Sequence, residues 1–338
     1  MKLKKLFSGI TAGLAMAAAL TGTQVAQADE MKALNFGIIS TESSQNLRTV
    51  WEPFLADMSE DLGMEVKPFF ATDYAGIIQA MRFDKVDVAW HGNKSAMEAV
   101  DRAGGEIFAQ TVDVSGNPGY WSLLIAHKDN DAINSVEDML AQADKLAFGN
   151  GDPNSTSGFL VPSYYVFAKN GVEPKKAFKR MTNAGHEANI LAVANGQVDV
   201  ATSNTLSLAR IQVTHPDKFD QVKVIWKSPL IPSDPIVWRK NLPESAKSKI
   251  YDFFMTYGTT GDAQELAVLE ALQWAPFKAS SNDQLLPIRQ LALFKQRASI
   301  ANDDGLSAED KESQLREIDD KLAALNRRMD ALEAASAN

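Results

Sequence analysis

The sequence predicts an α/β protein with two similar lobes, on two observations. From residue 33 to residue 90, short apolar strands alternate with amphipathic helices, which is the pattern of an open sheet with helices on its faces. The segments 81–89 (MRFDKVDVA) and 193–201 (VANGQVDVA) also resemble each other. Each ends a helix, turns on polar residues and enters a strand through Val-Asp-Val-Ala. The alternative is two turns that share only generic chemistry, but we favour one copy in each of two lobes.

Length and composition exclude several classes of protein. The chain has 338 residues, of which 45% are hydrophobic and 23% charged, with no cysteine and a formal net charge of −9. This is globular composition for about two domains, and it excludes a disordered chain, a collagen-like repeat and a disulfide scaffold. An acidic chain lacks the basic footprint of a general nucleic-acid binder. Without cysteine there is no thiol nucleophile, iron–sulfur cluster or Cys-ligated zinc.

Residues 1–28 have the three parts of a secretory signal peptide. Lysines at positions 2, 4 and 5 precede a mostly apolar run at 6–20, and Ala26-Gln27-Ala28 places small residues at the cleavage site. The alternative is a membrane anchor, but that needs about 20 apolar residues. We expect cleavage after Ala28. Because no cysteine can carry a lipid anchor, confinement between two membranes fits best, and we predict a periplasmic protein of a Gram-negative cell.

Strands and helices are expected in order along the chain from the spacing of apolar residues. The expected strands are short apolar runs bounded by polar, glycine or proline residues, at 33–39, 65–70, 86–90, 121–126, 145–148, 198–202, 222–226 and 236–238. The expected helices have apolar residues every three to four positions, at 50–58, 74–83, 136–143, 162–169, 190–195 and 243–257. A proline-rich stretch at 228–235 separates the last two strands.

A narrow apolar seam lies near the C-terminus. Its residues, spaced alternately by three and four, are Leu315, Ile318, Leu322, Leu325, Met329 and Leu332. This is the a/d pattern of a coiled coil. The alternative is an amphipathic helix packed on its own domain, which usually has a wider apolar stripe. The narrow seam therefore favours a partner helix, and we predict a homodimer formed through these residues.

The segment 148–158 (FGNGDPNSTSG) is the richest in residues suited to binding. It leads from a strand towards a helix, its glycines allow close backbone approach, and consecutive hydroxyls supply donors. A helix N-terminus behind such a turn offers free N–H groups, so the segment can cradle a small oxyanion. It is neither a P-loop nor a dinucleotide fingerprint, because Gly-Lys-Ser/Thr and the third glycine are missing. From spacing alone, an ordinary capped turn stays an equal alternative.

Other polar and aromatic residues give weaker signals. The histidines are His91, His127, His186 and His215. None are spaced as H-x-x-x-H, so we expect no zinc or other metal site, and no cofactor. His186 is expected in a polar loop after a strand. No G-x-S-x-G motif occurs, and no base is paired in sequence with the candidate acids Asp152, Asp199 and Asp234. We therefore predict no catalytic residues.

Five segments carry a resemblance to a known family: 34–39, 74–79, 149–159, 184–187 and 231–238. Their most specific motifs are Ser-Thr-Ser-Gly, Gly-His-Glu and Asp-Pro-Ile-Val-Trp. With them, the chain after its signal resembles the periplasmic phosphonate-binding proteins of ABC importers. The resemblance implies a two-lobed type II periplasmic binding protein with two crossover strands, near 120–125 and 228–238, plus a C-terminal amphipathic helix associated with dimerisation. The implied parts are lobe 1 at 29–122 and 235–300, lobe 2 at 123–234, and a C-terminal helical extension at 301–338.

The resemblance also assigns residues to the phosphonate group of the ligand. The matching positions are Tyr74, Tyr120, Ser155, Thr156, Ser157 and His186. Several neutral donors in a dry cleft can offset the desolvation of an anion without a lysine, because each charge-assisted hydrogen bond contributes roughly 1.5–3 kcal/mol.

The substituent side of the site departs from the family. Asp234 matches an aspartate that receives the ligand's amine in aminoalkylphosphonate binders. Leu206 stands where the best-known members have a glutamate that assists this amine, and His91 stands where they have a tyrosine. The phosphonate half therefore matches the family, and the amine half is altered.

The implied function is the capture of a phosphonate, either 2-aminoethylphosphonate or another alkylphosphonate, without catalysis. The ligand would pass to an inner-membrane ABC permease and its ATPase. One alternative is a receptor for another small oxyanion, such as phosphite or a sulfonate. Another is a periplasmic hydrolase that uses Ser155 or Ser157 with His186, although no base–acid pair is visible. The effector domain of a transcription regulator is disfavoured by the export signal and the lack of an N-terminal helix-turn-helix.

Overall fold

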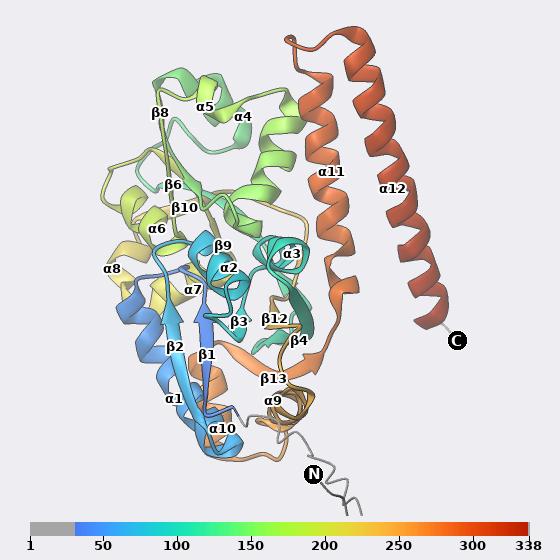
Figure 1. The fold of residues 1–338 in the computed structure, drawn as a ribbon. Helices are drawn as coiled ribbons and strands as arrows, with labels where there is room; N and C mark the ends of the chain where they lie inside the picture. Colours follow the sequence, from blue (N-terminus) through green and yellow to red (C-terminus); the bar gives the residue numbers. More distant parts are fainter. Residues whose placement is uncertain (1–30, 337–338) are drawn as a thin grey trace, which may run out of the picture. The chain divides into compact units, whose positions relative to one another are not determined.

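A computed structural model describes residues 31–336, which form two lobes, each around its own sheet (Figure 1). The strands of the first sheet are β1 (Ala33–Ile38), β2 (Glu65–Phe70), β3 (Val88–Trp90), β4 (Gly105–Asp113), β12 (Pro235–Arg239) and β13 (Trp274–Ala279). Their order is β13-β4-β12-β3-β1-β2, with β1 parallel to β2 and β3, and β12 antiparallel to β3 and β4. The predicted signal peptide at 1–28 lies outside the described residues.

The second sheet is built from the intervening part of the chain. Its strands are β6 (Ser122–His127), β7 (Ala147–Gly151), β8 (Arg180–Ala184), β9 (Val200–Asn204) and β10 (Val222–Lys227), in the order β10-β6-β9-β7-β8. β7 is parallel to β8 and β9, and β6 is antiparallel to β9 and β10. The chain thus leaves the first lobe after β4 and returns to it with β12, so the predicted two-lobed α/β class is confirmed.

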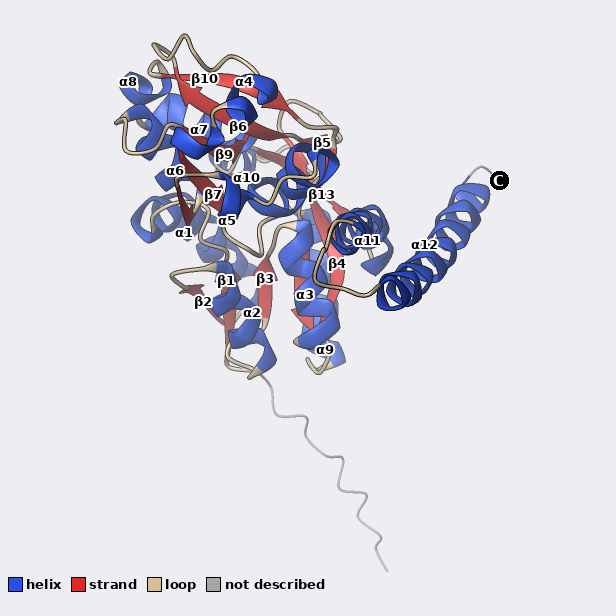
Figure 2. Ribbon diagram, turned by 90° about the horizontal axis from the view of Figure 1, so that it is seen from above, coloured by secondary structure: helices blue, strands red, loops and turns tan. Residues whose placement is uncertain are grey.

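Helices pack around the strands of both sheets (Figure 2). The longer ones are α1 (Ser44–Leu62), α2 (Tyr74–Arg82), α3 (Asn93–Arg102), α6 (His186–Ala194), α7 (Thr205–Thr214), α9 (Glu244–Thr256), α10 (Ala263–Ala271), α11 (Leu286–Ala301) and α12 (Ala308–Ser336). The short ones are α4 (Val136–Ala141), α5 (Pro174–Ala177) and α8 (Pro216–Phe219). The segment 162–169 is helical as expected, and it consists of a π-helical turn at Ser163–Phe167 followed by a 3₁₀ turn at Ala168–Asn170. Within residues 31–336, no helix combines the length and the apolar character needed to span a membrane.

The two segments that connect the lobes pair with each other. β5 (Gly119–Tyr120) and β11 (Ile231–Pro232) form a short antiparallel ladder, and they lie at the expected crossovers. Gly119 approaches the Ile231 main chain so closely that a Cβ at residue 119 would lie 1.9 Å from the Ile231 carbonyl oxygen. Any larger residue at position 119 would therefore push the connectors apart.

The repeated Val-Asp-Val-Ala motif makes the same contacts in both lobes. Asp87, which precedes β3, accepts the N–H of Asn35 through Oδ2 at 2.8 Å. Asp199, which precedes β9, accepts the N–H of Ala147 through Oδ2 at 2.7 Å. Each carboxylate thus binds the neighbouring parallel strand, β1 in the first lobe and β7 in the second. The interpretation of the echo as one copy per lobe is confirmed.

The C-terminal helix α12 packs against α11 of the same chain, as Figure 1 shows. Ile318 and Leu322 are buried in one cluster with Ile300, and Leu315 is partly buried against it. Outside this seam, Arg297 Nε and Asp319 Oδ1 form an ion pair at 2.8 Å.

This packing corrects the prediction that the whole seam meets a second chain. Its first half is covered by α11, because a/d spacing specifies a facing helix and does not distinguish a helix of the same chain from one in a second copy. The residues of the second half, which stay half-buried, are Leu325, Met329 and Leu332.

Candidate ligand-binding site

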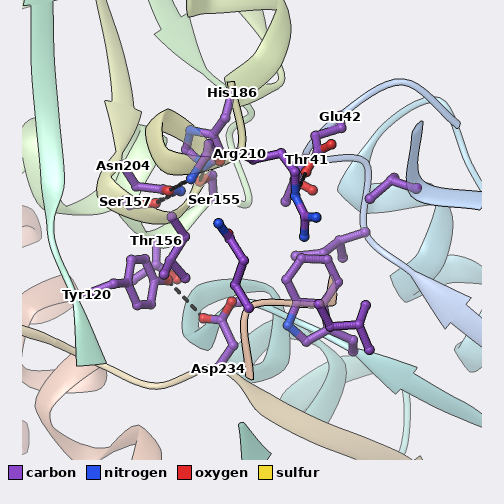
Figure 3. A pocket seen from close by; sticks show the side chains of 18 of the residues that line it. Thr41, Glu42, Tyr120, Ser155, Thr156, Ser157, His186, Asn204, Arg210 and Asp234 are labelled. Atoms are coloured by element: carbon purple, nitrogen blue, oxygen red, sulfur yellow. Dashed lines mark hydrogen bonds and ion pairs between the residues drawn. The ribbon is translucent and has the colours of Figure 1, made fainter. Parts of the chain in front are cut away.

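A cavity of about 660 Å³, counting the space open to solvent, is lined by residues of both lobes and of the connector. Most of the residues predicted from the sequence line it, and Figure 3 shows several of them facing one another across it. Those brought together are Tyr74, Tyr120, Ser155, Thr156, Ser157, His186, Leu206 and Asp234. His91 is not among the lining residues.

The three hydroxyl residues lie at the turn after β7, where Ser155 is the N-cap of a π-helical turn at Thr156–Leu160. A Cβ on Gly151 would lie 2.4 Å from the main chain of Gly158, so only glycine lets the strand end approach the turn this closely. Ser155 caps the turn, because its Oγ accepts the N–H of Gly158 at 2.9 Å. Asn204 Nδ2 donates to Ser157 Oγ at 3.1 Å. Both serine oxygens therefore accept a hydrogen bond, which leaves their own hydrogens free to donate elsewhere.

His186 faces these serines from the first position of α6, not from the loop that the sequence predicted. Its Nε2 lies 3.3 Å from Ser155 Oγ and 3.3 Å from Ser157 Oγ. Burial lowers the pKa of His186 to about 4, so the imidazole is neutral near pH 7 and carries one N–H. A neutral ring beside two hydroxyls can serve an oxyanion as a donor without bringing a second charge into the cavity.

The same geometry does not support the hydrolase alternative. A serine nucleophile activated by histidine needs a third group that orients the ring, usually a carboxylate on Nδ1. Among residues 31–336, no hydrogen-bond partner reaches His186 Nδ1, which is buried. Ser155 Oγ is also committed to the turn as an acceptor. Within the same residues, no cluster of His, Asp and Glu could hold a metal ion.

Two tyrosines reach the cavity from the first lobe and the connector. Tyr74 is the first residue of α2, and Tyr120 belongs to β5. Tyr120 Oη donates to Asp234 Oδ1 at 2.8 Å. Burial and the carboxylates of Asp152 and Asp234 hold the pKa of Tyr74 well above 10, and burial and Asp234 do the same for the pKa of Tyr120. Both phenols therefore keep their protons.

Asp234 is a weaker anion than an exposed aspartate. Burial raises its pKa to about 7, although the side chains of Tyr120 and Trp90 act to lower it. Near neutral pH a substantial fraction of this carboxyl is therefore uncharged.

The rest of the cavity is largely apolar and aromatic. Leu206 lines it, as do Trp51, Trp90 and Trp274, whose ring centroids lie 5.3 to 5.8 Å apart. At these separations the indoles pack on one another and form a wall, with no space between them for a cation. The resulting surface suits an alkyl chain.

The expectation that His91 contacts the substituent is not met. His91 is fully buried, and its Nδ1 lies 3.1 Å from Ser95 Oγ. Trp90, the preceding residue, lines the cavity instead. His91 directly follows β3, which ends at Trp90, and its side chain turns into the interior of the first lobe.

Sequence reasoning missed Glu42 and Arg210, which also line the cavity. Glu42 belongs to the loop that follows β1, and Arg210 lies on α7 four residues after Leu206. Two signals could have found them. Ligands in open α/β sheets bind beyond the carboxyl ends of strands, and residues four apart share one face of a helix.

A glutamate outside the cavity joins the lobes. Glu187, directly after His186, accepts the N–H of Ser43 at 2.5 Å and Asn46 Nδ2 at 2.7 Å. Ser43 is the N-cap of α1, so a carboxylate of the second lobe caps a helix of the first. Glu187 is not among the residues that line the cavity, so it does not stand in there for a glutamate at position 206.

Two further hydrogen bonds cross between the lobes beside the hydroxyl residues. Thr156 Oγ1 accepts the N–H of Lys94 at 2.8 Å, and Asp152 Oδ2 accepts the N–H of Tyr74 at 3.2 Å. The turn that carries the serines therefore also touches the opposite lobe.

Comparison with known proteins identifies the family of this chain. The sequence profile of the family described as "ABC transporter, phosphonate, periplasmic substrate-binding protein" matches residues 36–285. The chain is 62% identical over 308 residues to the phosphonates-binding periplasmic protein of Escherichia coli K12. The matched region covers 91% of this chain and 90% of that protein.

Solved structures agree with this match. A binding-protein component of an ABC phosphonate transporter from Pseudomonas aeruginosa has a TM-score of 0.88 and 64% identity, over 90% of this chain and all of that one. A protein from Prochlorococcus marinus, solved in complex with methylphosphonate, shares the fold with a TM-score of 0.68 and 22% identity over 77% of this chain and 97% of that one. The chain thus has the predicted type II periplasmic binding protein fold, and it belongs to the family of periplasmic phosphonate-binding proteins of ABC transporters.

Proposed function

We propose that this chain, as the periplasmic phosphonate-binding component of an ABC transporter, holds the phosphonate group of its ligand in the cradle of Ser155, Thr156 and Ser157. His186 completes the cradle, and Tyr74 and Tyr120 contact the same oxygens from the first lobe and the connector. The observation that carries the proposal is the convergence of neutral donors in one buried turn, with His186 Nε2 within 3.3 Å of both serine hydroxyls.

The energetics of this arrangement favour an anion with several acceptor oxygens. A phosphonate loses its hydration on entering the cavity, and each charge-assisted hydrogen bond returns roughly 1.5–3 kcal/mol. A protein with a formal net charge of −9 can bind it, because donors at hydrogen-bond distance outweigh distant charges screened by solvent. The apolar wall beyond the cradle favours a carbon substituent over phosphite or phosphate.

We propose that the lobes are residues 29–122 with 235–300 and residues 123–234, and that they close on the ligand about the β5–β11 ladder. Support comes from the strand membership of the two sheets and from the ladder itself. The cross-lobe bonds of Glu187 and Thr156 form only when the lobes meet. The contacts with the ligand and the hydrogen bonds between the lobes therefore form together when the lobes close.

Removing a donor from the cradle should weaken phosphonate binding. We expect Thr156→Ala and His186→Ala each to cost roughly 1–3 kcal/mol, because an acceptor oxygen of the buried anion then lacks its partner. Titration calorimetry with 2-aminoethylphosphonate and ethylphosphonate measures the loss, and phosphite, phosphate and taurine complete the panel. Thr156→Ser, which keeps the hydroxyl, is the matched control. Unchanged affinity in both alanine variants would place the phosphonate elsewhere.

Removing the charge of Glu187 should hinder closure without touching the ligand. We expect Glu187→Gln to weaken every phosphonate alike, by about 1–2 kcal/mol, because the cap of α1 loses a charged acceptor. Small-angle scattering should show a contraction of the wild type on adding phosphonate, if the free form is open, and a smaller contraction of the variant. Glu137→Gln, an exposed acid in the first turn of α4, is the control. An open free form with no contraction would exclude closure.

We propose that Leu206 makes the chain less selective for an amine than relatives with glutamate at this position. Leu206→Glu should restore a partner for a desolvated ammonium, worth on the order of 1.5–3 kcal/mol, or about ten- to a hundred-fold in affinity. The preference for 2-aminoethylphosphonate over ethylphosphonate should widen by that amount, as measured by calorimetry. Leu206→Gln is the uncharged control. If the preference does not change, position 206 does not face the amine.

We propose that self-association, where it occurs, uses the second half of the α12 seam. The half-buried residues there are Leu325, Met329 and Leu332. We expect the full chain to sediment as a dimer at tens of micromolar, and Met329→Glu to weaken the dimer while leaving phosphonate affinity unchanged. A monomeric wild type at that concentration would contradict the proposal.

A further inference from the structure

The cavity has two acidic side chains that could meet a cationic substituent, Glu42 and Asp234. Asp234 Oδ1 already accepts the phenol of Tyr120 at 2.8 Å. Its charge is also incomplete near neutral pH, since burial raises its pKa to about 7. Asp234 is therefore a poor sole partner for an ammonium group.

Burial also raises the pKa of Glu42, although Arg210 acts to lower it, so Glu42 differs from Asp234 in its contacts. Its side chain is 9% exposed, and within residues 31–336 no donor makes a hydrogen bond to its carboxylate. The nearest cation is Arg210, whose Nε lies 3.5 Å from Glu42 Oε1. That Nε is buried and makes no hydrogen bond in the described part of the chain. Glu42 thus has a nearby opposite charge and unused acceptor capacity, and its partly exposed side chain lines the cavity.

Arg210 holds Glu42 from the opposite lobe. Arg210 Nη1 donates to the carbonyl oxygen of Ala271 at 2.7 Å, so its guanidinium is tied to the first lobe although α7 belongs to the second. Figure 3 shows Arg210 and Glu42 side by side, away from Tyr120 and Asp234. Leu206, one helical turn before Arg210, offers no acceptor. Of the two carboxylates that line the cavity, the one that accepts no hydrogen bond within residues 31–336 is therefore on the loop after β1.

We propose that Glu42 accepts the protonated amine of an aminoalkylphosphonate and that Arg210 positions Glu42 for this contact. The proposal rests on the function proposed above, and it names the residue that contacts the amine and so distinguishes an aminoalkylphosphonate from an alkylphosphonate. Because the pair joins the two lobes, an amine that reaches Glu42 also stabilises the closed form. The neutralising effect of Arg210 on Glu42 limits the gain, which agrees with a reduced preference for amines.

Calorimetry with 2-aminoethylphosphonate and ethylphosphonate tests this assignment. We expect Glu42→Gln to weaken 2-aminoethylphosphonate about ten-fold more than ethylphosphonate, because only the former carries the ammonium. Glu187→Gln is the matched control, since Glu187 joins the lobes without lining the cavity and should weaken both ligands equally. Ethylphosphonate binding by Glu42→Gln also reports that the variant is folded.

The outcomes separate this assignment from the function itself. Equal weakening of both ligands in Glu42→Gln would show that Glu42 only joins the lobes, and it would overturn the amine contact. If Glu42→Gln binds both ligands with the wild-type affinities, the amine contact is overturned as well. If wild-type protein binds neither phosphonate, the proposed function fails, whereas phosphonate binding without any effect at Glu42 leaves that function intact.

Discussion

The contact between Gly151 and Gly158 is the constraint on which the cradle depends. Without side chains at these positions, the end of β7 and the following turn come within a distance that a Cβ at residue 151 would prevent. The turn can then be capped by Ser155, and both serine hydroxyls are directed at one imidazole nitrogen. Donors arranged in this way lose little entropy when the anion arrives, which is the general benefit of preorganisation.

The neutrality of His186 follows from the same burial. A charged imidazole would have to be desolvated before a ligand compensates it, and burial lowers its pKa to about 4 for that reason. The donors of the cradle, which are hydroxyl groups and a neutral imidazole, therefore carry no net charge before the ligand binds. The closing contacts are arranged around it, with Glu187 next to His186 in sequence and Thr156 bonded to the opposite lobe. The first two residues of α6 thus have complementary positions. His186 faces the serines of the cradle, and Glu187 binds the other lobe.

Much of the fold could be predicted from the sequence, because strands and turns depend on local patterns. The hydroxyl-rich segment at 148–158 is visible too, but spacing alone leaves an ordinary capped turn as an equal alternative, and the family resemblance assigns it to the ligand. The Val-Asp-Val-Ala echo was sufficient to predict a repeated αβ unit, and each of its aspartates makes the same bond to a neighbouring strand. Features that depend on tertiary packing were not predictable in this way. The Glu42–Arg210 pair joins residues 168 positions apart, and nothing local marks them as partners. At the end of β3, Trp90 lines the cavity and the following His91 is buried away from it, and the partner of α12 is a helix of the same chain.

The charges of the cavity support the proposal that the substituent end is the less selective half. Arg210 balances Glu42, Tyr120 occupies Asp234, and burial keeps His186 neutral. Before the ligand enters, the polar groups therefore nearly compensate one another. In the proposed binding mode, the phosphonate adds negative charge at one end, where donors converge, and the tail meets a wall of indoles and Leu206 at the other. An alkyl tail gains there by the hydrophobic effect, whereas an ammonium must exchange its hydration for two carboxylates, of which one accepts the phenol of Tyr120 and the other lies beside Arg210. Selection for an amine thus depends on how much of the Glu42 carboxylate Arg210 leaves available.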